Sequence, residues 1–139
     1  MKICGIEIKG SEALLAVASL DAGQPVHVGV ATKKIGLEDD EDAAQVKAFA
    51  AQVRAFVSEH GIGQLAIKKR SKKGDFAGGP TTFKIEGVLQ LLDNCTVELV
   101  SPQTVSAQAK KHDLELPASL NKYQHEAYKS ACAVLLKRG

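Results

Sequence analysis

The chain has 139 residues, 45% of them hydrophobic and 24% charged, with a formal net charge of +2. These values predict one domain, residues 1–139, and they exclude a global positive field that would attract nucleic acid. No apolar run approaches the roughly 20 residues of a membrane helix, and the N-terminus lacks signal-peptide character, so we expect a cytoplasmic protein without a membrane partner.

Three strands are predicted at the start of the chain. The first, residues 2–9, alternates apolar and polar side chains with the two-residue period of a strand. Short turns containing glycine lead into a second strand at 13–20 and a third at 26–30. Because the connections are short, we expect the three strands to pair antiparallel.

An acidic run at residues 38–42 precedes a long amphipathic helix. Apolar side chains recur with helical spacing from Val46 to Val57, and Gly61 stands where a left-handed residue ends many helices. We attribute the acidic run to the start of this helix, where carboxylates oppose the positive end of the helix dipole, rather than to a partner site.

The rest of the chain alternates between helices and strands. Further strands are predicted at 64–68 and 96–100, and further helices at 81–93, from Ser101 and from Asn121. Gln124 stands three residues after Asn121, as in a capping box. The element order predicts an α/β fold with a mixed five-stranded sheet, three antiparallel strands and then two parallel ones, and helices on both faces.

The three cysteines and Glu86 are expected to have structural rather than catalytic roles. Cys4, Cys95 and Cys132 are far apart and show no spacing typical of zinc sites, so we expect reduced, buried thiols. Glu86 is expected to be a solvated helix residue.

Several segments together resemble the ribonuclease H-like superfamily, in particular its RuvC-type resolvase branch. These segments are Gly5-Ile6-Glu7 with the Gly10-Ser11 turn, the strand 65–68, the segment 97–105, and the last helix with Glu126. The resemblance implies a ribonuclease H-like fold. The chain also resembles a bacterial family known only as a domain of unknown function.

The resemblance implies a two-metal nuclease site, but several of its expected ligands differ in this sequence. Nucleases of this fold bring several carboxylates to two Mg²⁺ ions about 4 Å apart, which activate water and hold the scissile phosphate. Here Glu7 stands in place of an aspartate, Lys68 in place of the second acid, and Tyr123 where another acid would lie, while Glu126 supplies one carboxylate. We expect Glu7, Lys68 and Glu126 to meet in one cleft. Glu7 and Glu126 then form a degenerate catalytic site that holds at most one weakly bound ion, because the Lys68 ammonium repels cations.

Basic residues follow the fourth predicted strand. They are Lys68, Lys69, Arg70, Lys72 and Lys73, and glycines come after them. They lie at the C-terminal end of a central strand, where ligands of α/β sheets tend to bind. Lysines and glycines before a helix start suit a phosphate backbone, so this loop is a candidate DNA- or RNA-binding site, the alternative being a solvated loop.

Three functional hypotheses follow. The first is a non-catalytic or weakly active nucleic-acid-binding protein that uses the basic loop, with no certain cofactor and Mg²⁺ only if it is active. The second is a Mg²⁺-dependent, structure-selective nuclease that uses Glu7 and Glu126. The third is a homodimeric interaction module that does not bind nucleic acid. We favour the first because a lysine stands in the expected metal site.

Overall fold

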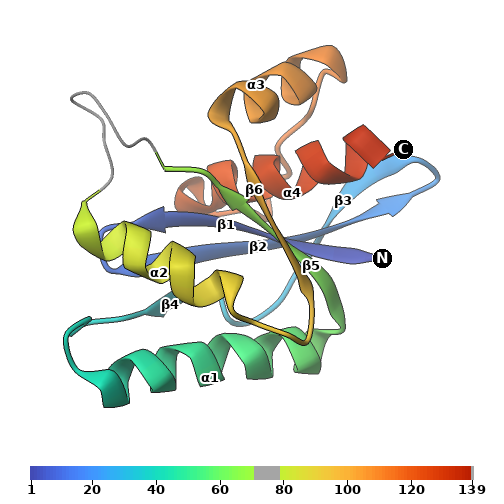
Figure 1. Cartoon of the computed structure of the whole chain (residues 1–139). Coiled ribbons are helices and arrows are strands. Elements are labelled where there is room, and N and C mark those ends of the chain that lie inside the picture. The colour runs from blue at the N-terminus through green and yellow to red at the C-terminus, as the bar shows by residue number, and fades with distance from the viewer. Residues whose placement is uncertain (71–78, 139) are drawn as a thin grey trace.

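The computed structural model describes residues 1–70 and 79–138 of the chain. Its elements, in chain order, are β1 (Lys2–Lys9), β2 (Glu12–Asp21), β3 (Gln24–Val28), β4 (Lys34–Gly36), α1 (Ala43–His60), β5 (Ile62–Lys68), α2 (Pro80–Gln90), β6 (Thr96–Val100), α3 (Pro102–Lys111), the 3-10 turn η1 (Lys122–Gln124) and α4 (His125–Arg138) (Figure 1).

The strands form one mixed sheet in the order β3-β2-β1-β5-β6. The pairs β1–β2 and β2–β3 are antiparallel, and the pairs β1–β5 and β5–β6 are parallel. The predicted path of three antiparallel strands followed by two parallel ones is therefore confirmed. The expected count of five strands was too low, because β4 adds a short sixth strand antiparallel to β2. Its three residues are too few to show alternation in the sequence.

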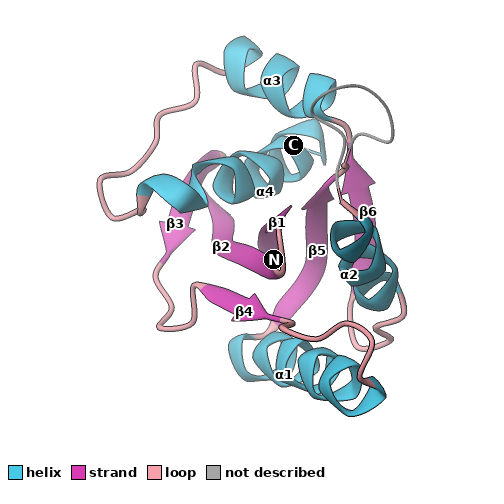
Figure 2. Ribbon diagram, turned by 90° about the vertical axis from the view of Figure 1, so that its left-hand side faces the viewer, coloured by secondary structure: helices cyan, strands magenta, loops and turns pink. Residues whose placement is uncertain are grey.

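Helices cover both faces of the sheet, as predicted. Helices α3 and α4 lie on one face, and α1 and α2 lie on the other (Figures 1 and 2). Each face has its own apolar cluster. The α1–α2 side contains Ile6, Ile8, Phe49 and Ile67, whereas the α4 side contains Ile3, Ala66, Ala127 and Tyr128. Alternate residues of one strand thus enter different cores, as the two-residue period requires.

Local signals fix both ends of α1. Asp42 caps α1, because its Oδ1 accepts from the backbone N–H of Ala44 at 3.0 Å, and Gly61 ends the helix at a φ of 63°. The predicted start of this helix directly after the acidic run is therefore confirmed at Asp42, although the first turn itself contains no acidic residue. Helix α2 ends at Gln90, three residues before its predicted end, and the next residue, Leu91, is 79% exposed.

Helix α4 lies very close to β1. A Cβ atom built on Gly5 would lie 1.7 Å from the backbone oxygen of Ala127, so only glycine fits at this position. The neighbours of Gly5 in the same row of the sheet are Ala16 on β2 and Ala66 on β5, both fully buried. Small side chains on three adjacent strands thus allow the close approach of the helix.

The start of α4 is tied to the sheet by a buried glutamine. The capping box predicted at Asn121 is present, because Gln124 Oε1 accepts from the backbone N–H of Asn121 at 2.9 Å. The Nε2 of the same glutamine donates to the backbone oxygen of Leu15 on β2 at 2.9 Å. This contact positions the first turn of α4 over the sheet.

Across residues 1–70 and 79–138, none of the helices combines the length and the apolar character that crossing a bilayer requires.

Candidate functional site: an ion-pair cluster under the last helix

Three charged side chains from distant parts of the chain meet at one end of the sheet. Glu7 lies near the end of β1 and Lys68 is the last residue of β5. The parallel register pairs Ile6 with Ile67, so Glu7 and Lys68 follow one position further along. Both are on the face covered by α4, because the flanking Ile6 and Ile67 enter the opposite core.

Lys68 bridges two carboxylates. Its Nζ lies 2.9 Å from Glu126 Oε1 and 3.9 Å from Glu7 Oε2. The side chain of Lys68 is 20% exposed and that of Glu7 is 17% exposed, so both charges are partly shielded from water. At such burial an unpaired charge is costly, and the close pairing offsets that cost.

A second lysine completes the cluster. Lys129 Nζ lies 3.1 Å from the other carboxylate oxygen of Glu126, three residues earlier on the same helix. The four side chains, Glu7, Lys68, Glu126 and Lys129, are called the ion-pair cluster below. Two carboxylates face two ammonium groups, so the charges of the cluster balance.

The predicted meeting of Glu7, Lys68 and Glu126 is therefore confirmed. Lys68 makes its shorter contact with Glu126, because α4 lies so close to the sheet above Gly5. The catalytic and metal-binding roles assigned to Glu7 and Glu126 remain predictions. The contribution of Lys129 was missed, and only its helical spacing from Glu126 could have indicated it.

The cluster changes the titration of Glu126. Partial burial raises the pKa of this carboxyl, but hydrogen bonds from Lys68 and Lys129, with the charges of the two lysines, outweigh burial and hold the pKa below its ordinary value. The folded state therefore favours the ionised carboxylate.

This shift predicts a pH-dependent contribution to stability. A group with a lowered folded-state pKa stabilises the fold above its unfolded pKa, about 4.3 for glutamate, and loses that effect as pH falls through the folded value. We expect the difference in free energy of unfolding between the wild type and Glu126→Gln to shrink as pH falls from about 7 to about 3. Urea denaturation at several pH values measures it, and a difference that does not change with pH would contradict the assigned pairing.

The charges of this cluster oppose the binding of a divalent metal ion. The Lys68 ammonium lies between the two carboxylates that would be the ligands, and like charges repel at such distances. Among the residues that the structure describes, no three His, Cys, Asp or Glu side chains are grouped as a metal would require. Tyr123, at the position expected for a further acid, is 40% exposed and supplies no carboxylate.

The basic loop begins beside the cluster. The backbone N–H of Lys69 donates to the backbone oxygen of Val100 at 2.8 Å, which extends the β5–β6 pairing past Lys68. The side chain of Lys69 is exposed and Arg70 is half-buried. Lys72 and Lys73 lie outside the described residues. Of the predicted nucleic-acid-binding cations, Lys68 therefore belongs to the ion-pair cluster, and Lys69 and Arg70 follow it in the chain.

Glu86 differs from the expectation. It is only 9% exposed, and its Oε2 has no hydrogen-bond partner among the described residues. Glu86 lies on α2, which packs on the face opposite to α4, so it does not join the ion-pair cluster (Figure 2). The prediction that Glu86 is exposed to solvent was therefore wrong, because this position lies on the inward face of α2.

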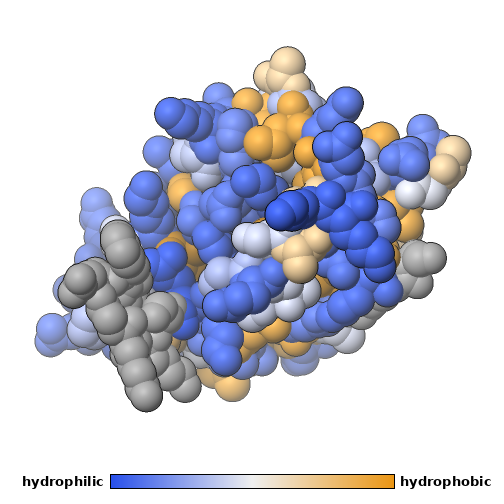
Figure 3. Space-filling model, turned by 90° about the horizontal axis from the view of Figure 1, so that it is seen from above, coloured by the Kyte–Doolittle hydropathy of each residue, from blue (hydrophilic) through white to orange (hydrophobic). Residues whose placement is uncertain are grey.

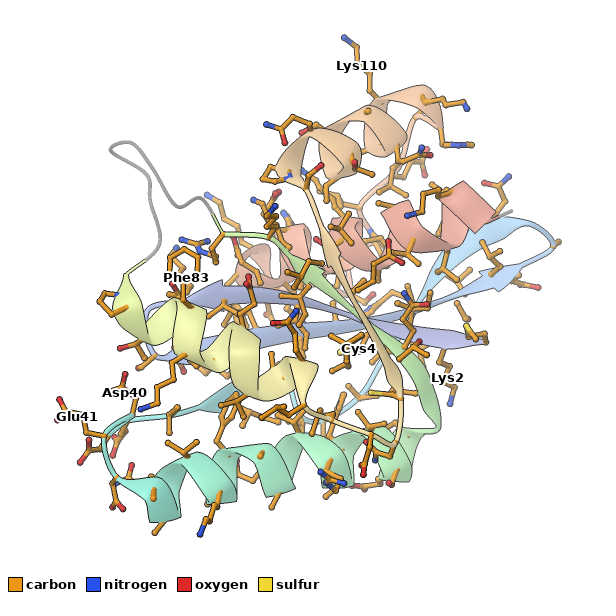
Figure 4. The ribbon with its side chains drawn as sticks, viewed as in Figure 1. Lys2, Cys4, Asp40, Glu41, Phe83 and Lys110 are labelled. Carbon is orange, nitrogen blue, oxygen red and sulfur yellow. The ribbon has the colours of Figure 1, made fainter. Side chains whose placement is uncertain are left out.

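The cysteines do not supply a nucleophile to the site. Cys4 and Cys132 are buried as predicted, and Cys4 lies within the sheet (Figure 4). Burial raises the pKa of each of these two thiols to about 12, so the reactive thiolate is disfavoured. Cys95 is only half-buried, which corrects the expectation for that residue.

The fold has known relatives among solved structures. The Thermus thermophilus RuvC structure matches with a TM-score of 0.75 and 12% identity, over 99% of this chain and 96% of that chain. T. thermophilus RuvC in complex with Holliday junction substrate matches with 0.72 and 13%, over 99% and 96%. The Fowlpox virus resolvase in complex with its substrate Holliday junction DNA matches with 0.52 and 13%, over 99% and 93%.

These likenesses define the class of the molecule as a mixed α/β protein with a RuvC-like ribonuclease H fold, as predicted. At such low identities they show the fold alone. The chain belongs to the family described as "Protein of unknown function (DUF3010)", whose model matches residues 1–134. No curated protein matches it.

Proposed function

We propose that this protein binds nucleic acid and has little or no nuclease activity. The low nuclease activity is inferred because a lysine-centred ion-pair cluster lies where the resemblance to RuvC-type nucleases implies the metal ions. The observation that carries the proposal is the position of Lys68 Nζ, 2.9 Å from Glu126 and 3.9 Å from Glu7. The ammonium balances the carboxylates without a metal, which removes a strong field for divalent cations.

The basic residues beside the cluster support binding to a phosphate backbone. Lys69 and Arg70 continue from β5 at the C-terminal end of a central strand, and Lys72 and Lys73 follow in the sequence. The cations of such a loop displace counterions from DNA or RNA, which makes the affinity dependent on salt. Two structures with the same fold, RuvC and the poxvirus resolvase, contain Holliday junction DNA.

Alanine replacement of the basic loop tests the proposal. We expect Lys69→Ala, Arg70→Ala, Lys72→Ala and Lys73→Ala, combined in one variant, to abolish most binding to a fluorescein-labelled DNA duplex and oligothymidylate in anisotropy titrations. The slope of log affinity against log salt should fall by about 0.9 for each duplex phosphate that the altered loop no longer neutralises.

The control removes charge elsewhere on the surface. Lys110→Ala with Lys111→Ala changes the end of α3, where Lys110 projects away from the sheet, and should leave affinity and salt slope nearly unchanged (Figure 4). Affinity that survives the loop replacement would reject the proposal. Mg²⁺-dependent cleavage of branched or single-stranded DNA that Glu7→Gln abolishes would instead establish an active nuclease.

A further inference from the structure

A partly exposed tyrosine and a lysine lie together on the α4 face of the sheet. Tyr123, in the turn before α4, is 40% exposed, whereas Tyr128 is 1% exposed and belongs to the core. Lys34 Nζ lies 5.6 Å from the centroid of the Tyr123 ring, within the range of a cation–π contact. The Tyr123 hydroxyl has one long contact, 3.4 Å from Asn121 Nδ2, so hydrogen bonding does little to hold the ring in place.

This pair is continuous with the ion-pair cluster. Leu14 on β2 pairs with Glu7 on one side and with Lys34 on the other, so these three residues share one row across the sheet. Neighbouring strands are about 4.8 Å apart, which places the backbone of Lys34 about 10 Å from that of Glu7. Tyr123 precedes Glu126 by three residues, close to one helical turn. The Tyr123–Lys34 pair therefore lies next to the ion-pair cluster.

The surroundings of Tyr123 are mainly basic. Lys34, at the start of β4, and Lys122, the residue before Tyr123, are both exposed, and one carboxylate, Glu12, lies 3.9 Å from Lys34. Seen from the side of α3 and α4, the visible surface of the described residues is largely hydrophilic, with scattered smaller apolar patches (Figure 3). An accessible aromatic ring among cations suits a nucleobase whose phosphates lie nearby.

We propose that Tyr123 and Lys34 form a stacking site for an unpaired nucleobase, so that the protein prefers single-stranded segments over duplex. The base stacks on the accessible part of the Tyr123 ring, while Lys34 and Lys122 meet the flanking phosphates. The exposed Lys69, which follows the ion-pair cluster residue Lys68, then meets the strand further along. The inference rests on the proposed binding of nucleic acid and names the form that is bound.

Replacing the ring separates stacking from charge. We expect Tyr123→Leu to weaken binding of fluorescein-labelled oligothymidylate about 5- to 100-fold, because it removes one base–aromatic stack. Affinity for a duplex of the same length should change less than twofold. Tyr123→Phe keeps an aromatic ring and should retain the single-strand affinity, and Lys34→Gln should weaken it while removing one cation. Circular dichroism and thermal melting of each variant verify the fold.

Tyrosine fluorescence gives a direct reading of the contact. The chain has no tryptophan and two tyrosines, one of them buried, so quenching by unlabelled oligothymidylate reports on Tyr123. Quenching that disappears in Tyr123→Phe, together with retained binding by that variant, supports stacking.

Other results overturn the inference in distinguishable ways. Equal loss of single-strand and duplex affinity in Tyr123→Leu, or no loss, overturns the stacking site while leaving the basic loop intact. Polyglutamate that quenches Tyr123 as oligothymidylate does would assign the surface to an acidic protein. A wild type that binds no nucleic acid overturns both the inference and the proposed function.

Discussion

Lys68→Glu should turn the ion-pair cluster into a site whose occupation by Mn²⁺ stabilises the protein. The replacement removes the ammonium and adds a third carboxylate where Lys68 now contacts both Glu7 and Glu126. Hard divalent cations prefer such oxygen ligands. With free Mn²⁺ about 100 times its dissociation constant, binding to the folded state alone adds about 2.7 kcal/mol. A thermal melt followed with and without Mn²⁺ measures this gain.

The matched control is Lys68→Met, which removes the charge and keeps an unbranched chain without adding a ligand. Its response to Mn²⁺ should be small, and the wild type should show none, because the ammonium lies between the two carboxylates. A wild type that Mn²⁺ stabilises as strongly as Lys68→Glu would contradict the lysine-filled site. Manganese density beside Glu126 in a soaked wild-type crystal would do the same.

Gly5→Ala should lower the free energy of unfolding by roughly 3 kcal/mol or more, at or beyond the upper end of ordinary overpacking effects. The added Cβ would lie 1.7 Å from the Ala127 oxygen and within 3 Å of two further backbone atoms of α4. Because these atoms belong to the backbone, relief requires the helix to move from the sheet. Urea denaturation measures the loss.

Gly87→Ala is the control for this replacement. Gly87 lies in α2, and a Cβ built there meets nothing within 4 Å. Alanine has the higher helix propensity, so this variant should gain up to about 1 kcal/mol. If Gly5→Ala stayed within about 1 kcal/mol of the wild type, α4 would not lie against β1 as described. The pairing of Lys68 with Glu126 would then have no structural basis.

The short distance between α4 and the sheet determines the geometry of the ion-pair cluster. A helix held further from β1 would carry Glu126 away from Lys68, leaving a half-buried ammonium with only the 3.9 Å contact to Glu7. Lys129 would lose its indirect connection to the sheet as well. The small residues on β1, β2 and β5 therefore determine the geometry of the charged cluster as much as the charged residues do.

Much of the architecture follows from local patterns in the sequence. Strand alternation, Asp42 and Gly61 at the ends of α1, and the Asn121–Gln124 capping box act between residues that are near one another in the chain. These signals predict the order of elements, and the short turns predict the antiparallel start of the sheet. The meeting of Glu7, Lys68 and Glu126 was predicted through a family resemblance, since no local pattern relates residues 58 positions apart.

Tertiary structure decided the features that depend on register and packing distance. Strand β4 exists because three residues find a partner in β2, and its register places Lys34 in the row of Glu7. The contact of Lys68 with Glu126 is shorter than its contact with Glu7, because Gly5 has no side chain and α4 can therefore pack closely against the sheet. Glu86 is buried because α2 turns that position inward. The sequence alone determined most of the elements, since their signals are local, whereas β4 and the distances between charges arise only when separate elements pack together.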